Sequence, residues 1–214
     1  MIQYLRDNWA SLEPELVTHL TVVVITLAVA TVIGVSLGIA ASRSRLLSSL
    51  VLGLASAMIT LPSFAVFGVL EIYFGLGDLP VEIGLVLYAQ LPIVRNTAVA
   101  LSGVDPAVLE AATGMGFRPL RRLLRIELPL ALPLIIAGLR QATVAVVAIA
   151  TVGAAVGSNN LGAPILAGIR GGGTYPVLAG VVPVALIGVL ADALLGGAQR
   201  LLSRGRGTVP TATA

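Results

Sequence analysis

The chain has 214 residues, of which 57% are hydrophobic and 11% are charged, and its mean hydropathy is +1.01. So few polar residues cannot cover a water-soluble globule of this length, which excludes a soluble protein and predicts an all-α integral membrane protein. The net charge of +3 comes from arginine without any lysine, and the arginines flank apolar segments, so nucleic acid is not an expected partner. With no cysteine and a single histidine, no metal site is predicted either.

Five apolar segments are long enough to cross a membrane as helices, because about 17–25 residues span a hydrocarbon core of about 30 Å. They are predicted at about residues 17–41, 47–74, 81–101, 128–156 and 176–195. The first segment also allows a signal peptide, but acidic residues precede it and arginines follow it, which favours a retained helix. Pro62 lies within the second segment and should kink it, because proline removes one helical hydrogen bond.

The arginines predict the orientation of these spans. If the N-terminus is outside, ten arginines lie on the inner side and two on the outer side, as the positive-inside rule requires. The inner ones are Arg43, Arg45, Arg95, Arg118, Arg121, Arg122, Arg125, Arg200, Arg204 and Arg206, and the outer ones are Arg6 and Arg170. We therefore expect a single transmembrane domain over 1–214, a cytoplasmic loop at 104–127 and a short flexible cytoplasmic tail at 203–214.

The cytoplasmic loop contains a predicted short helix. Asp105 is a good N-cap and Pro106 suits the first helical position, so the helix should begin there and end near Gly114 or Gly116. Its spacing would place Ala107 and Ala111 with Gly114 on one smooth face, which another protein could approach closely. A second short helix is predicted to start at Pro119 and to carry the arginines. The alternative is a solvated basic loop that only fixes the orientation.

The stretch "EAATGMGFRPLRRLLRIELPLALPLIIAGLR" resembles the EAA loop of permease subunits of ATP-binding-cassette (ABC) importers. The pattern falls on Glu110, Ala111, Ala112, Gly114 or Gly116, Ile126, Leu128 and Pro129. The resemblance implies a type I ABC importer permease (MetI-like) fold, in which this loop forms a coupling helix that docks on a separate ATPase subunit. The residues implied to contact that subunit are Glu110, Ala111, Ala112, Gly114, Gly116 and Arg118.

A longer resemblance suggests the substrate. The stretches "LYAQLPIVRNTAVALSGVDPAVLEAATGMGF" and "ELPLALPLIIAGLRQATV" are similar to permeases for glycine betaine, choline, carnitine and proline betaine. A methionine or other amino-acid permease is the alternative within the superfamily, and a small secondary transporter or channel is the alternative outside it.

The resemblance also implies which partners the chain has and which membrane contains it. The implied partners are the ATPase, a second permease that is an identical or a sister chain, an extracytoplasmic substrate-binding protein, and the lipid of a bacterial or archaeal cytoplasmic membrane. The chain itself should be non-catalytic and bind no cofactor, since it lacks a Walker glycine loop with lysine and ATP would bind to the partner.

The candidates for a translocation path are the polar span residues Arg140, Gln141 and Asp192, together with Pro62 at the expected kink. A charge at this depth is costly, so Arg140 either pairs with an acid or faces water. One hypothesis is an ion pair with Asp192 on the fifth span, and the other is that Arg140 lines the path. Arg95 lies within snorkelling distance of the inner face, which favours a topological role.

Overall fold

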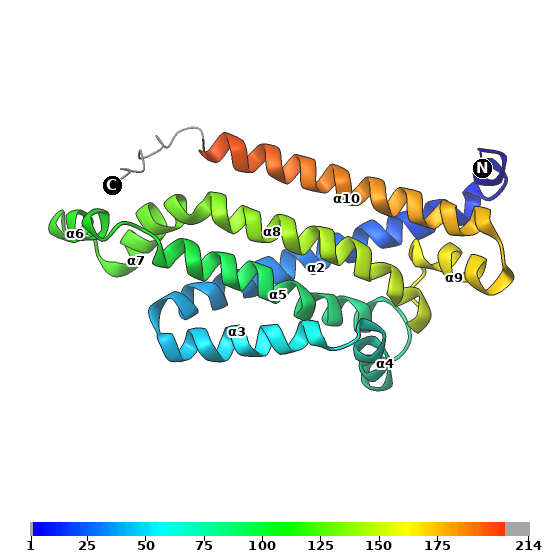
Figure 1. Cartoon of the computed structure of the whole chain (residues 1–214), viewed down its shortest axis with the longest axis horizontal. Coiled ribbons are helices and arrows are strands. Elements are labelled where there is room, and N and C mark those ends of the chain that lie inside the picture. The colour runs from blue at the N-terminus through cyan, green and yellow to red at the C-terminus, as the bar shows by residue number, and fades with distance from the viewer. Residues whose placement is uncertain (1, 204–214) are drawn as a thin grey trace, which may run out of the picture.

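Every regular element in the described residues, 2–203, of the computed structural model is a helix (Figure 1). The elements are α1 (Ile2–Asp7), α2 (Trp9–Arg43), α3 (Arg45–Thr60), α4 (Ser63–Phe74), α5 (Asp78–Ser102), α6 (Pro106–Gly114), α7 (Pro119–Arg122), the π-helical turn η1 (Leu123–Glu127), α8 (Leu128–Ala150), the 3₁₀ turn η2 (Thr151–Val156), α9 (Gly162–Gly171) and α10 (Thr174–Ser203). Apart from Ser203, the predicted tail lies outside the described residues.

Four of the helices are long and apolar enough to cross a membrane, and the pair α3 and α4 counts as a fifth if it is taken as one broken span. The predicted spans at 17–41, 81–101, 128–156 and 176–195 fall within α2, α5, α8 with η2, and α10, which confirms them. A helix does begin at Pro119 as predicted, but it continues through η1 into α8 as one helix of 38 residues.

The prediction of one kinked helix over 47–74 is wrong. The chain stops being helical after Thr60, resumes at Ser63, and turns by 99° between the two helices. Leu61 and Pro62 are both extended, since the proline ring disfavours helical backbone in the preceding residue. The Leu61 carbonyl, which is left outside the helix, accepts a hydrogen bond of 2.8 Å from the Tyr88 hydroxyl on α5. The break is therefore satisfied by a residue of another helix.

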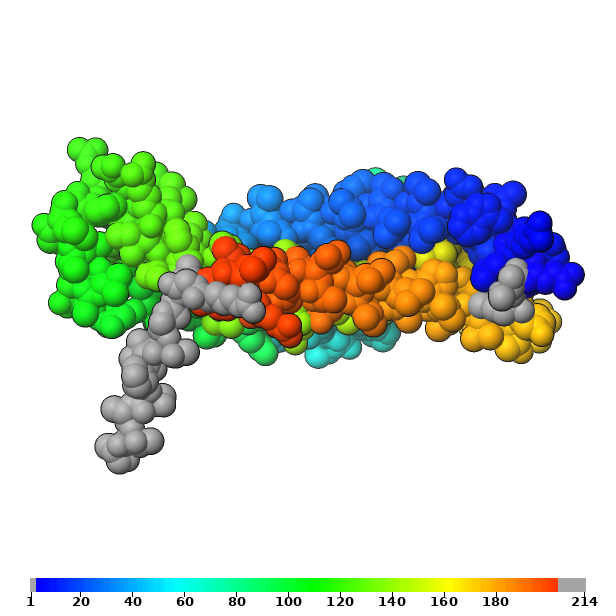
Figure 2. All heavy atoms as spheres, turned by 90° about the horizontal axis from the view of Figure 1, so that it is seen from above, coloured from blue at the N-terminus to red at the C-terminus, as the bar shows by residue number. Residues whose placement is uncertain are grey.

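The core of the bundle is made by α2, α5 and α8, and small residues allow these helices to approach closely. A Cβ atom at Gly38 on α2 would lie 2.5 Å from Cβ of Thr97 on α5. Likewise, a Cβ atom at Gly138 on α8 would lie 2.7 Å from the carbonyl oxygen of Pro92. Side chains at these glycines would push α5 away from both neighbours. The helix α10 packs along the outside of α8 (Figures 1 and 2).

The two ends of the bundle differ in charge. One end carries α6 and α7 beyond the ends of α2 and α5, and the other carries α1, α4 and α9 (Figures 1 and 2). The arginines in the half of the described bundle toward α6 are Arg43, Arg45, Arg95, Arg118, Arg121, Arg122, Arg125 and Arg200. Among the described residues, the opposite end has two arginines, Arg6 and Arg170, and it carries the acids Asp7, Glu13, Glu15, Glu71, Asp78 and Glu82. Arg204 and Arg206 lie outside the described residues.

Candidate functional site

The helix α6 is formed as its sequence predicts. An Asp105 carboxylate oxygen accepts a hydrogen bond of 2.8 Å from the backbone N–H of Ala107, and Pro106 occupies the first turn. The helix ends at Gly114, and Gly116 follows it with a φ angle of +79°, a conformation that glycine adopts without strain. These local signals fix both ends of α6 at the arginine-rich end of the bundle.

Most of the α6 surface is exposed. Glu110, Ala111 and Gly114 face solvent, as do Gly116 and Arg118 just beyond the helix. Ala112 is fully buried, so this member of the predicted contact set packs α6 against its own chain.

Large apolar side chains around α6 are exposed as well, although the sequence analysis did not single them out. They are Val108, Met115, Leu120 and Leu124, and the side chains of Met115 and Leu120 are 69% and 68% exposed. Leu120 and Leu124 line one surface depression together with Arg118, Arg121 and Arg125. Exposed apolar side chains among charged residues are typical of a protein interaction site.

A buried carboxylate, which sequence reasoning missed, joins α6 to the membrane helices. Glu127, at the last position of η1, has a side chain that is only 1% exposed. Its Oε2 lies 2.6 Å from Nη2 of Arg43 at the end of α2, and its Oε1 lies 2.9 Å from Nε of Arg122. The Arg122 Nη1 in turn donates a hydrogen bond of 3.1 Å to the hydroxyl of Thr113 on α6. One carboxylate thus connects α2, α6, α7 and the start of α8.

One feature of the sequence could have pointed to Glu127, namely that no other acidic residue lies near it. It is the only acid between Glu110 and Asp192, and it directly follows the arginine-rich segment. A carboxylate that enters an apolar span among arginines needs a cationic partner, because a buried unpaired charge is costly. The π-helical turn that positions it is a feature often found at functional sites.

The ion pair predicted between Arg140 and Asp192 is present. Nε and Nη2 of Arg140 lie 3.0 Å and 2.8 Å from the two oxygens of Asp192, and Nη1 donates a bond of 2.9 Å to Gln199. The guanidinium packs over Gly196, where a Cβ atom would lie 3.1 Å from Cζ. This bidentate pair fixes α10 to α8 within the membrane.

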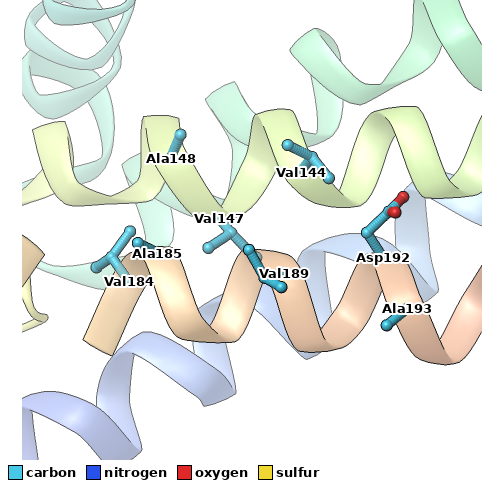
Figure 3. Close-up of a pocket in the computed structure, with 9 residues that line it drawn as sticks. Val144, Val147, Ala148, Val184, Ala185, Val189, Asp192 and Ala193 are labelled. Atoms are coloured by element: carbon cyan, nitrogen blue, oxygen red, sulfur yellow. The ribbon is translucent and has the colours of Figure 1, made fainter. Parts of the chain in front are cut away.

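Asp192 also lines a groove between α8 and α10, which has a volume of about 550 Å³. Figure 3 shows its carboxylate directed toward α8, at the end of a row of valine and alanine side chains from both helices. The Arg140 and Asp192 side chains remain 32% and 42% exposed beside this apolar groove.

The other two path candidates, Gln141 and Pro62, lie apart from this groove. Gln141 follows Arg140 on α8 but lines a cavity of about 280 Å³ between α3, α5 and α8. Tyr88 and Arg95 of α5 line the same cavity, and Tyr88 holds the carbonyl next to Pro62. The structure therefore divides the four candidates: Gln141 lines this cavity, Pro62 lies next to the carbonyl that Tyr88 holds, and Arg140 and Asp192 pair between α8 and α10.

A bundle of four or five apolar helices with a capped, exposed helix at its arginine-rich end is the architecture of a type I importer permease. The fold closely matches a chain of the MetNI methionine ABC transporter in an inward-facing conformation, with a TM-score of 0.79 and 18% identity over 92% of this chain and 98% of that chain. A second crystal form of MetNI matches with a TM-score of 0.76 and 19% identity over 89% and 95% of the two chains.

Residues 16–204 match the model of the binding-protein-dependent transport system inner membrane component family, and the chain belongs to that family. It is 36% identical to the osmoprotectant import permease protein OsmW of Salmonella typhimurium, over 94% of this chain and 96% of that protein. It is 36% identical to the carnitine transport permease protein OpuCD of Listeria monocytogenes, over 95% and 92%. The glycine betaine/carnitine/choline transport system permease protein OpuCD of Bacillus subtilis is 37% identical, over 94% and 88%. The chain is thus a multi-pass membrane subunit of a transport system.

Proposed function

We propose that the chain is a permease subunit of an ATP-driven ABC importer for osmoprotectants of the glycine betaine, carnitine and choline class. The observation that carries this proposal is the exposed helix α6, which presents the EAATGMG sequence at the arginine-rich end of a permease bundle. The substrate class rests on the relatives, whose names specify these solutes and which match nearly the whole chain. The likeness to MetNI, at 18% identity, supports the fold and not methionine as the substrate.

The arginine-rich end of the bundle faces the cytoplasm of a bacterium or archaeon, and the N-terminus lies outside. The support is the concentration of arginine at the α6 end and of acids at the opposite end. The extracytoplasmic binding protein then approaches the end that carries α1, α4 and α9. The tail beyond Ser203 would be cytoplasmic.

The helix α6 docks on the ATPase subunit. Glu110, Ala111 and Gly114 provide a face with little side-chain bulk, Gly116 and Arg118 border it, and Met115 provides exposed apolar area. ATP is bound and hydrolysed by the partner, since this chain has no lysine for a Walker loop. ATP-driven closure of the ATPase subunits would move α6, and the Glu127 ion pairs would transmit that movement to α2 and α8 as a rigid body.

A second permease, identical or a sister chain, completes the path. The cavity at Gln141 lies beside the helix break at Pro62, and these two residues belong to the path side of the subunit. Arg140 and Asp192 hold α10 in place, which is a structural role.

The test is reconstitution in proteoliposomes with the candidate ATPase, sister permease and binding protein. We expect ATP hydrolysis to be stimulated by binding protein loaded with glycine betaine, carnitine or choline. Failure to recover an ATPase with the chain, or uptake that is indifferent to an ATP-site mutation in that ATPase, would refute the importer function. Stimulation by methionine alone would refute the substrate class.

A charge reversal tests the docking surface. Glu110→Lys should lower substrate-stimulated uptake at least about tenfold, because it places the wrong charge in the proposed interface, while membrane insertion stays intact. Unchanged uptake would refute the docking assignment. Arg200 is exposed on α10, outside the proposed docking surface, and Arg200→Glu is the matched control for a charge reversal.

A further inference from the structure

The cavity between α3, α5 and α8 contains one charged side chain. Its lining residues are Ile59, Tyr88, Leu91, Pro92, Arg95, Gln141, Ala145 and Ile149. Arg95 lies about 10 Å along α5 from Ser102, and Gln141 lies about 20 Å along α8 from Leu128. Both positions fall within a hydrocarbon core of about 30 Å. The cavity is therefore a mostly apolar space at membrane depth with a guanidinium at its wall.

Arg95 has no partner in the described part of the chain. The ion pairs found there involve Arg43, Arg122 and Arg140, and no hydrogen bond is formed by the Arg95 side chain. Arg43, Arg122 and Arg140 are each held by a carboxylate, whereas the exposed Arg95 side chain lines a cavity. A cation at this depth is costly unless water or an anion meets it.

The cavity also lies at the break between α3 and α4. The Tyr88 hydroxyl donates a hydrogen bond to the Leu61 carbonyl, so the ring is held at the edge of the break while it lines the cavity. Interrupted helices at membrane depth are tolerated where they border a cavity, and in transporters such positions mark solute sites. Tyr88 and Arg95 are seven residues apart on α5, which places them two turns apart on one face, separated by about 10 Å along the axis.

We propose that this cavity binds the transported solute, with Arg95 as the residue that selects zwitterions carrying a carboxylate. The inference rests on the proposed function and names the ligand contacts. The guanidinium of Arg95 binds the carboxylate, the Gln141 amide donates a further hydrogen bond, and the Tyr88 ring faces the quaternary ammonium group. A cavity of about 280 Å³ suits a small osmolyte. Glycine betaine and carnitine have both groups, whereas choline has the cation without the carboxylate.

The experiment compares uptake of glycine betaine, carnitine and choline by the reconstituted complex, with each solute supplied on saturating binding protein. Arg95→Gln should lower the turnover of glycine betaine and carnitine about tenfold or more, because a charge-assisted bond to the carboxylate is lost. Choline turnover should stay within about twofold, since choline makes no such bond. Arg95→Lys keeps the positive charge and should recover part of the loss. Arg200→Gln is the control, because Arg200 is an exposed arginine on α10, a helix that does not line this cavity.

The unfolding midpoint of each variant separates a ligand contact from a structural role. Arg95 makes no bond within the described chain, so Arg95→Gln should unfold at the same denaturant concentration as the parent. Equal loss of uptake for all three solutes, or no loss for any, would overturn the proposal. The parent complex could transport glycine betaine and carnitine but not choline. In that case the two variants are compared with each other, and equal turnover by Arg95→Lys and Arg95→Gln would overturn the proposal. If the parent complex carries none of the three, the proposed function itself fails, and the site assignment fails with it.

Discussion

Replacing Glu127 by alanine removes the one carboxylate that pairs with both Arg43 and Arg122. Its oxygens lie 2.6 Å and 2.9 Å from the two guanidinium groups, and its side chain is only 1% exposed. The substitution leaves two arginines facing each other across a buried space, and Thr113 of α6 loses the orientation of its Arg122 partner. We therefore expect both stability and coupling to fall.

The expected loss of stability follows from the burial of the three groups. Removing one member of a buried ion pair typically costs about 3–5 kcal/mol. The Arg43 and Arg122 side chains are 44% and 24% exposed, so water can rehydrate them in part, and we expect about 2–3 kcal/mol for Glu127→Ala. Glu127→Gln keeps an oxygen for one arginine and should cost about 1–2 kcal/mol.

Unfolding in mixed micelles with increasing SDS measures the stability, and the ratio of ATP hydrolysis with loaded and unloaded binding protein measures the coupling. Glu127→Gln should lower that ratio toward one under conditions in which the variant remains folded, because α6 is no longer held to α2. Glu13→Ala is the matched control for stability, since Glu13 is exposed and should change it by no more than about 0.5 kcal/mol. If Glu127→Ala behaves like Glu13→Ala in unfolding and keeps the parent's hydrolysis ratio, the reasoning is wrong.

Two further predictions concern the membrane bundle. Arg140→Leu should lower the SDS fraction at which the chain unfolds, because Asp192 and Gln199 lose their partner, and adding Asp192→Leu should recover most of the loss. Normal stability of Arg140→Leu with lost uptake would instead support a path role. Gly162→Ala should cost about 3 kcal/mol or more, since a Cβ atom there would lie 1.8 Å from the carbonyl oxygen of Thr151. Gly171→Ala, where no atom lies within 4 Å, is its control, and equal stability of these two variants would contradict the predicted clash.

Local features of the sequence were sufficient to predict most of the helices of the fold. The length and hydropathy of the apolar runs predicted four spans directly, because a bilayer core sets the length of a helix that crosses it. Asp105, Pro106 and Gly116 predicted the ends of α6, since caps and left-handed glycines act within a few residues. The resemblance in the EAATGMG segment pointed to the family to which the chain belongs.

The features that the sequence did not predict depend on contacts between residues that are far apart in the chain. The sequence indicated a kink at Pro62, but a complete break of 99° becomes tolerable because Tyr88, 27 residues from Leu61, accommodates the freed carbonyl. Glu127 was missed because its partner Arg43 lies 84 residues away.

The sequence also could not predict that two neighbouring path candidates face different surroundings. Arg140 and Gln141 are consecutive, yet helical rotation directs one toward α10 and the other toward the cavity with Arg95. Hydropathy and capping are properties of short segments, so the sequence by itself determined the spans, the charged end and α6. Which polar groups meet inside the bundle depends on how the helices pack, and only the tertiary structure decided that.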